Sequence, residues 1–219
     1  MPAEFEVLPG LPGTGPYPEQ FSATGLGTYR EGFVVRFFPK HSESWVGNFQ
    51  PGFTGFSRVF PHPDDRTVVV VSGGQIYHID PESRAVKSTI SCCVTEAITS
   101  DDYRILALAD YTDVYLLRSD GRLIESGRVS WDGISDLALG DKRLTGTAWN
   151  PINGQWRPFS MDIESGEVSG GSYRIETTSW RAIRRGRLPP SDRKQRHRLG
   201  IILVLALIVG LAICRLLNK

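Results

Sequence analysis

Between residues 31 and 173, the hydrophobic positions occur in short runs of β-branched and aromatic residues, and turn-forming residues separate these runs at regular intervals. No part of this region shows a convincing 3.6-residue spacing of apolar positions, which an amphipathic helix requires. Residues 1–30 are rich in Gly and Pro, which favours turns and short extended pieces over helix. The pattern therefore predicts an all-β domain.

Three segments repeat one pattern, namely residues 56–66, 94–104 and 134–143. Each contains a short strand and an acidic turn and ends on an Arg, and these arginines are 38 and 39 residues apart. Three further strands follow each segment. The expected second strands are 67–72, 105–109 and 144–149, the third strands are 75–80, 113–118 and 156–162, and the fourth strands are 85–90, 123–129 and 167–173.

A four-stranded unit of about 40 residues has the length of one propeller blade. Across roughly residues 56–173 the chain resembles the WD40 and related β-propeller families, through an Asp-Asp-Arg turn before the second strand and an Asp-x-Glu-Ser turn before the fourth. The Gly-His pair of those repeats is absent, and Trp131-Asp132 follows a fourth strand instead of ending a third. The resemblance implies an architecture and no particular family.

Residues 4–50 supply a degenerate fourth unit. We expect Glu4–Leu8 as its inner strand, the Gly-rich 21–27 as its second, 32–38 as its third and 43–50 as its fourth. The prediction is an all-β, propeller-like domain of about four 4-stranded repeats over residues 1–173. A closed four-bladed propeller is one possibility, and four units are enough to close one. An incomplete propeller that pairs with a second chain and a β-sandwich are the alternatives.

An apolar segment follows the β domain. Leu199–Cys214 is sixteen residues without charge, about 24 Å long as a helix, and Leu216 and Leu217 extend it if Arg215 turns its charge outward. The sequence therefore predicts a basic juxtamembrane linker over 174–198 and one transmembrane helix over 199–217. Ala206, Gly210 and Cys214 recur every four residues, a spacing of small residues that would allow a homodimer through this helix.

Charge predicts the topology. Residues 1–173 hold fourteen Lys/Arg against twenty-two Asp/Glu, a net charge of −8, whereas residues 174–198 carry +7. Basic residues beside a span mark the cytoplasmic side, and the chain starts without an apolar leader. We therefore expect a single-pass, tail-anchored protein with a cytoplasmic N-terminal domain and its C-terminus on the far side. The expected topology and lipid contacts are Trp180, Arg181, Arg184, Arg185, Arg187, Arg193, Lys194, Arg196 and Arg198.

Several function classes find no support in the sequence. The acidic β domain argues against a nucleic-acid partner, because phosphate binding needs clustered Lys and Arg. Catalytic motifs such as G-x-S-x-G, H-E-x-x-H and the Walker loop are missing, and the three cysteines lack metal-site spacing. No catalytic residue, cofactor or metal is predicted. His41, His62 and His78 are interpreted as satisfied or solvated, and Asp64-Asp65 and Asp101-Asp102 as turn residues.

Two sets of residues are candidates for binding. The first strand of each unit carries a charge at an equivalent position, and around a propeller axis Arg58 would pair with Glu96 or Asp136, either as a structural ion pair or as part of a small polar site. The second set is aromatic and could either pack between blades or present interaction hot spots. The candidates are Glu6, Arg58, Glu96 and Asp136 for the axis, and Trp45, Phe49, Phe53, Trp149 and Trp156 for aromatic contacts.

The function predicted from these observations is a non-catalytic, membrane-anchored binding module that recognises a protein partner through a rigid β scaffold. One alternative is an immunity-type inhibitor of a basic toxin or effector at the membrane, for which an acidic surface would be suited. Another is an enzyme or metal-binding sensor whose site lies at the mouth of the propeller channel.

Overall fold

The computed structural model describes residues 4–15, 17–25, 31–91 and 93–173. The chain divides into two units, residues 1–174 and 175–219, and all described residues belong to the first. The predicted linker over 174–198 and the predicted anchor over 199–217 lie outside the described residues. Among the residues that are described, no helix is long and apolar enough to cross a membrane.

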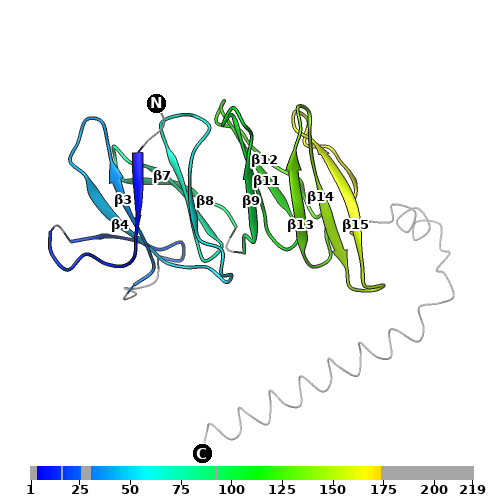
Figure 1. The fold of residues 1–219 in the computed structure, drawn as a ribbon, viewed down its shortest axis with the longest axis horizontal. Helices are drawn as coiled ribbons and strands as arrows, with labels where there is room; N and C mark the ends of the chain where they lie inside the picture. Colours follow the sequence, from blue (N-terminus) through cyan, green and yellow to red (C-terminus); the bar gives the residue numbers. More distant parts are fainter. Residues whose placement is uncertain (1–3, 16, 26–30, 92, 174–219) are drawn as a thin grey trace, which may run out of the picture. The chain divides into compact units, whose positions relative to one another are not determined.

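Sixteen strands form four 4-stranded sheets, a propeller-like all-β arrangement, and the described residues contain no helix (Figure 1). The first sheet contains β1 (Glu4–Leu8), β2 (Glu19–Phe21), β3 (Phe33–Phe38) and β4 (Trp45–Phe49). The second contains β5 (Arg58–Pro61), β6 (Val68–Ser72), β7 (Gln75–Asp80) and β8 (Ala85–Thr89). The third contains β9 (Glu96–Thr99), β10 (Ile105–Ala109), β11 (Val114–Arg118) and β12 (Leu123–Glu125). The fourth contains β13 (Ile134–Leu139), β14 (Arg143–Asn150), β15 (Gln155–Asp162) and β16 (Val168–Gly170).

The second, third and fourth sheets confirm the predicted repeat. In each, four consecutive strands pair in chain order as an antiparallel meander. The acidic residues of the repeat form the predicted turns, because Asp64 and Asp102 each accept a hydrogen bond from the backbone N–H of the Arg two residues later, at 2.9 and 3.1 Å. Asp side chains that bond the following backbone stabilise turns in this way.

The first sheet differs from the prediction. Its strand order is β1-β3-β4-β2, so Phe33–Phe38 takes the second position, where residues 21–27 were expected. The outer position is held by Glu19–Phe21, which pairs in parallel with β4. The β-branched and aromatic run of β3 is suited to a strand buried between two neighbours, whereas the Gly-rich stretch that follows Phe21 is a poor strand former.

Three apolar clusters lie between successive sheets. The first and second sheets share a core around Phe37, Phe49 and Tyr77, and the second and third share one around Val69 and Leu108. The third and fourth sheets share a core around residues such as Leu116, Leu144, Phe159 and Met161. Within the part of the chain that the structure describes, no such cluster joins the first sheet to the fourth.

Candidate functional site

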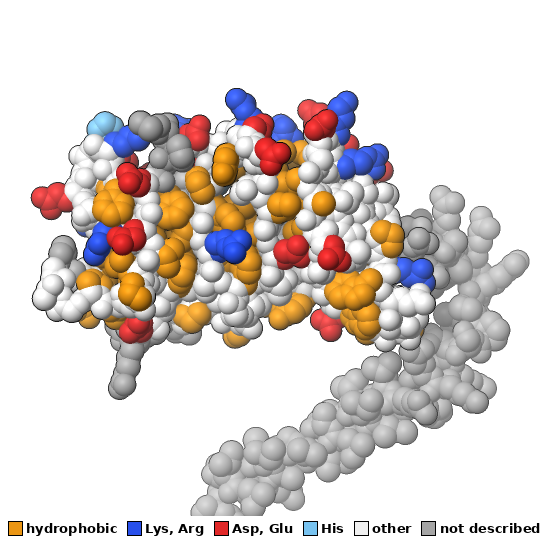
Figure 2. Space-filling model, viewed as in Figure 1, with side chains coloured by type: hydrophobic (Ala, Val, Ile, Leu, Met, Phe, Trp, Pro, Cys, Tyr) orange, Lys and Arg blue, Asp and Glu red, His pale blue; other side chains and the backbone are white. Residues whose placement is uncertain are grey.

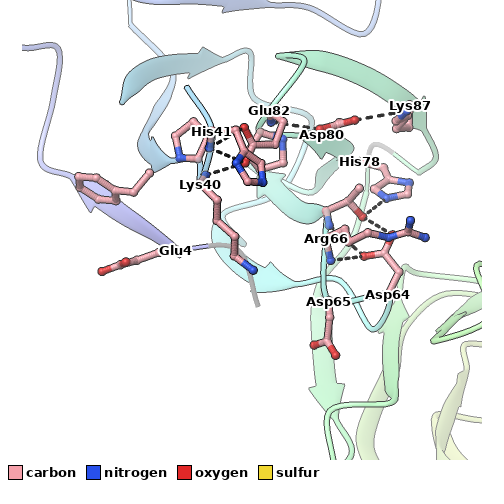
Figure 3. A pocket seen from close by; sticks show the side chains of 14 residues that line it. Glu4, Lys40, His41, Asp64, Asp65, Arg66, His78, Asp80, Glu82 and Lys87 are labelled. Atoms are coloured by element: carbon pink, nitrogen blue, oxygen red, sulfur yellow. Dashed lines mark hydrogen bonds and ion pairs between the residues drawn. The ribbon is translucent and has the colours of Figure 1, made fainter. Parts of the chain in front are cut away.

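A pocket of about 830 Å³ lies beside the second sheet (Figure 3). Its wall comes from the end of β3 with the loop that follows, the β5–β6 turn, and β7 with the turn after it, together with one residue each of β1 and β8. Eleven of its fourteen lining residues are polar or charged. The residues are Glu4, Phe38, Pro39, Lys40, His41, Asp64, Asp65, Arg66, Thr67, His78, Asp80, Pro81, Glu82 and Lys87.

Strand pairing brings His62 and His78 together, with His78 in the pocket wall and His62 buried behind it. Val69 lies opposite both Phe60 and His78 in the register of the second sheet, and the backbone of His62 pairs with that of Thr67. Because side chains alternate across a strand, His62 and His78 lie on the face that packs against the third sheet. Their rings stack with centroids 4.4 Å apart, and His62 is 2% exposed.

Asp64 and Thr67 complete a polar cluster with the two histidines. The Oδ1 atom of Asp64 lies 3.2 Å from Nδ1 of His62, and the backbone N–H of Asp64 lies 3.1 Å from the same nitrogen. The hydroxyl of Thr67 contacts Oδ2 of Asp64 at 2.8 Å and Nε2 of His78 at 2.6 Å. His62, Asp64 and His78 each offer one ligand atom, and these three atoms all lie within 4.8 Å of one another.

Burial sets the protonation states of the cluster. Desolvation lowers the pKa of His62, although the neighbouring carboxylate of Asp64 opposes this shift. Desolvation also lowers the pKa of His78, to about 4, so both rings are neutral at pH 7. For Asp64, desolvation raises the pKa, but hydrogen bonds from Arg66 and Thr67 outweigh it and leave the pKa below its usual value. The cluster therefore holds two neutral imidazoles and one carboxylate.

The exposed carboxylate of Glu82 joins two other segments of the pocket wall. Glu82 accepts hydrogen bonds from the backbone N–H groups of Lys40 and His41, which fastens the loop after β3 to the turn after β7. Asp80 organises that turn by accepting from the backbone of Glu82, and it also pairs with Lys87 at 3.4 Å (Figure 3). These contacts hold a loop of the first sheet and a turn of the second sheet together at the mouth of the pocket.

The four charges predicted to line a propeller axis have separate surroundings in the structure. Glu6 pairs with Arg36 across β1 and β3 at 3.0 Å. The guanidinium of Arg58 lies over the ring of Phe56, and among the described residues no ion pair joins it to Glu96 or Asp136.

The two carboxylates of that set contact the fourth sheet. Glu96 accepts a hydrogen bond from the backbone N–H of Leu137 at 3.0 Å, which joins β9 of the third sheet to β13. Asp136 is exposed and accepts from the hydroxyl of Thr147 at 2.8 Å. The contact of Glu96 links the third and fourth sheets, whereas that of Asp136 lies within the fourth sheet, between β13 and β14.

The aromatic candidates fall into buried and exposed groups. Trp45 and Phe49 are 3% and 0% exposed and belong to the core between the first two sheets. Phe53, in the loop after β4, is 82% exposed. The same sequence stretch therefore contributes two core residues and one surface aromatic.

The fourth sheet carries an aromatic patch, which we define as Trp131, Trp149, Ile152, Trp156 and Tyr173. Trp149 and Trp156 face each other across the β14–β15 hairpin with ring centroids 5.3 Å apart, and Ile152 at its tip is 79% exposed. Trp131 packs edge-on against Tyr173 at 4.8 Å. The hydroxyl of Ser172 joins the two pairs, because it accepts from the backbone N–H of Trp131 and donates to the carbonyl of Trp149. Figure 2 shows hydrophobic side chains gathered at this end of the fourth sheet.

The cluster of His62, Asp64 and His78 was not predicted from the sequence. A signal was present, since His-x-Asp directly follows a strand and His78 lies on a strand two positions further along the sheet. Recognising it requires the register that places Val69 opposite His78, because only then do the two histidines share a face. From the sequence, the histidines were instead interpreted as satisfied or solvated, and Asp64 as a turn residue.

The predicted membrane contacts lie outside the described residues. They are Trp180, Arg181, Arg184, Arg185, Arg187, Arg193, Lys194, Arg196 and Arg198 of the linker, and Ala206, Gly210 and Cys214 of the anchor.

Comparison with known proteins identifies no family: no family model and no curated protein match the chain. Two solved structures resemble it weakly. A eukaryotic initiation factor is 13% identical with a TM-score of 0.35, over 65% of this chain and 40% of that one. A hydrazine synthase from Kuenenia stuttgartiensis is 14% identical with a TM-score of 0.25, over 55% of this chain and 48% of that one. The chain thus spans less than half the length of either protein.

Proposed function

We propose that this protein is a non-catalytic binding module that recognises a protein partner through its β scaffold and is held at a membrane by residues 199–217. The aromatic patch of the fourth sheet is the observation that carries the proposal. Large aromatic side chains on a rigid scaffold supply most of the binding energy at protein interfaces. A partner seated on this patch would bury the exposed parts of Trp156 and Ile152.

The patch is organised before any partner arrives. Trp149 and Trp156 are cross-strand neighbours on two 8-residue strands, β14 and β15, which pair along their whole length. The guanidinium of Arg128 lies over the rings of both Trp131 and Tyr173, at 5.3 and 4.7 Å from their centroids. Fixed side chains lose little conformational entropy on binding, which supports a role in recognition.

Charge supports the placement at a membrane. An acidic domain of net charge −8 is repelled by an anionic lipid surface, whereas a linker of +7 is attracted to it. In the proposed arrangement the membrane therefore sets the location, while the β domain stays available for its partner.

A finer proposal concerns the fold: the four sheets are blades of an incomplete propeller. The described residues support it, because no apolar core joins the first sheet to the fourth among them.

Affinity capture of the full-length protein from its own cells tests the proposed interface. Ile152→Asp places a charge at the tip of the β14–β15 hairpin, and Trp156→Ala removes an exposed ring. Both should lose the partner that the unaltered chain captures. Tyr17→Ala is the matched control, because Tyr17 is a surface aromatic, 89% exposed, in the loop before β2.

Two further variants complete this experiment. Phe53→Ala distinguishes the loop after β4 from the patch, and loss of the partner only in Phe53→Ala would contradict the proposed interface.

Deletion of residues 199–219 should move the protein from the membrane fraction to the supernatant. Retention of the truncated chain on membranes would contradict the anchor.

A further inference from the structure

We propose that His62, Asp64 and His78 form a binding site for one divalent transition-metal ion of the zinc type. The site lies on the second sheet, so it is independent of the aromatic patch on the fourth sheet and of the proposed partner. It also differs from the charged residues predicted to line a propeller axis, since none of those belongs to it.

The ligand set fits this class of metal. Two imidazole nitrogens and one carboxylate oxygen are common protein ligands for Zn²⁺, whereas Ca²⁺ and Mg²⁺ prefer sets made of oxygen alone. The distance of 3.2 Å between His62 Nδ1 and Asp64 Oδ1 is close to the edge of a tetrahedron whose metal–ligand bonds are about 2.0 Å. His78 completes the set, with all three ligand atoms within 4.8 Å of one another.

The arrangement of the ligands is fixed by backbone pairing. His62 is held next to Thr67 by the hydrogen bond from its backbone N–H, and His78 is held opposite Val69. The carboxylate of Asp64 accepts hydrogen bonds from the N–H groups of Arg66 and Thr67, both at 2.9 Å. Partners of this kind orient metal ligands and raise affinity.

The protonation states suit metal binding. Metal ions bind the neutral imidazole and the ionised carboxylate, and protons compete with them for the same atoms. Burial lowers the pKa of both histidines, and the hydrogen bonds on Asp64 keep its pKa low. Binding near neutral pH therefore needs no net release of a proton from the three side chains. Because the hydroxyl of Thr67 donates to Asp64, Nε2 of His78 donates to that hydroxyl, so its proton must move to Nδ1 before Nε2 can bind the metal. Nδ1 of His62 would likewise exchange the backbone N–H of Asp64 for the metal.

The hydroxyl of Thr67 lies between two of the proposed metal ligands, Asp64 and His78. Its hydroxyl bridges Asp64 Oδ2 and His78 Nε2, so a polar atom already joins the groups that a metal would join. On binding, His78 would exchange its contact with this hydroxyl for a bond to the metal, and the hydroxyl would keep its hydrogen bond to Asp64.

One side of the site opens into the pocket. Asp64 and His78 line the pocket wall, whereas His62 is buried behind them. A metal held by all three would have three protein ligands and could take one more donor, for which the pocket of about 830 Å³ beside Asp64 and His78 has room. Sites with three protein ligands keep an open position for water or for a donor atom of a ligand.

Zn²⁺ titration of the full-length, untagged chain, after treatment with EDTA, tests the proposal. We expect one equivalent of Zn²⁺ to bind and the unfolding temperature to rise with the concentration of free metal. His78→Gln and Asp64→Asn should each weaken binding by about 10- to 100-fold or more. Asn can still accept the backbone hydrogen bonds of the turn, and unfolding curves in EDTA verify that each variant is folded.

Two control variants separate this site from other histidines. His41→Gln removes a histidine that lines the same pocket but lies outside the cluster, and His197→Gln removes the fourth histidine of the chain. Both should bind Zn²⁺ like the unaltered protein. Equal binding by all four variants, or no retained Zn²⁺ in the unaltered chain, would overturn the proposal and leave a hydrogen-bonded cluster without metal.

A Co²⁺ spectrum provides a readout that does not depend on the variants. Tetrahedral Co²⁺ with nitrogen and oxygen ligands gives moderately intense visible bands without a thiolate charge-transfer band. This spectrum is the expected result. A thiolate band would show that cysteine binds the metal, and it would contradict the assignment to the histidine cluster.

Discussion

The imidazole rings of His62 and His78 stack with their centroids 4.4 Å apart and their planes inclined by 12°. Two protonated rings would repel each other at this distance, and each ring would also lose solvation on the side that faces the third sheet. The stacked pair is therefore stable when both rings are neutral. Protonation of this pair therefore opposes the folding of the second sheet in acid.

The stability of the metal-free protein should fall as the pH is lowered from about 6.5 to about 4. The pKa of His78 is about 4 when folded, against 6.5 for an unperturbed imidazole, so the unfolded state binds more protons throughout this range. Stability consequently rises with pH here, by on the order of 2 kcal/mol in total for this partly buried group. Urea unfolding in EDTA at several pH values measures the slope. His78→Gln should flatten it, whereas the same slope in His78→Gln would contradict the assignment.

A buried indole joins the first two sheets. Trp45 donates a hydrogen bond from Nε1 to the carbonyl of Pro81 at 2.9 Å, and its ring stacks on Phe37 with centroids 4.4 Å apart. Trp45→Phe removes the donor and leaves a void, so we expect a loss of about 2 kcal/mol in the free energy of unfolding. Far-UV circular dichroism in urea measures it. Trp156→Phe is the control, since Trp156 is 48% exposed and should lose less than about 0.5 kcal/mol.

The repeat of strand and turn could be predicted from sequence because each unit carries its own local signals. A β-branched or apolar run such as Val68–Ser72 forms a strand, and Asp80 and Asp162 each bond the backbone N–H two residues later, which marks the turn before the fourth strand. These interactions span few residues. Such local signals can be recognised from the sequence alone, so the second, third and fourth sheets were predicted closely.

The first sheet and the histidine cluster depend on contacts between residues far apart in the chain. Glu19–Phe21 is a short segment, and only its parallel pairing with β4 makes it the outer strand. In the same way, His62 and His78 are separated by 16 positions, and the register of β5, β6 and β7 brings them together. Sequence patterns report propensity and period, and they carry no information about which strands become neighbours through a long connection.

Glu96 should stabilise the junction of the third and fourth sheets. Its carboxylate accepts the backbone N–H of Leu137, beside Asp136, which has a positive φ of 58° and interrupts the pairing of β13. Glu96→Ala leaves this N–H without its partner and should cost about 1–2 kcal/mol in unfolding free energy. Glu96→Gln keeps an accepting oxygen and should cost less. Equal losses in both variants would contradict a role as acceptor and favour a role for the charge.

Gly146 lies where a side chain has no room. A Cβ atom at this position on β14 would come within 2.7 Å of Cε1 and 2.8 Å of Cζ of Phe159, and within 3.1 Å of Leu137. Phe159 is 3% exposed and belongs to the core of the third and fourth sheets, so its ring cannot move outward without disturbing that packing.

Gly146→Ala should therefore lower the free energy of unfolding by about 1–3 kcal/mol, as overpacked cores do. Gly13→Ala is the matched control, because a Cβ at Gly13 meets no atom within 4 Å and its backbone is not in the left-handed region. Thermal unfolding of the two variants distinguishes packing from a general preference for Gly. If Gly146→Ala were as stable as Gly13→Ala, the ring of Phe159 would have to be free to move, and the close packing of β14 against β15 would be wrong.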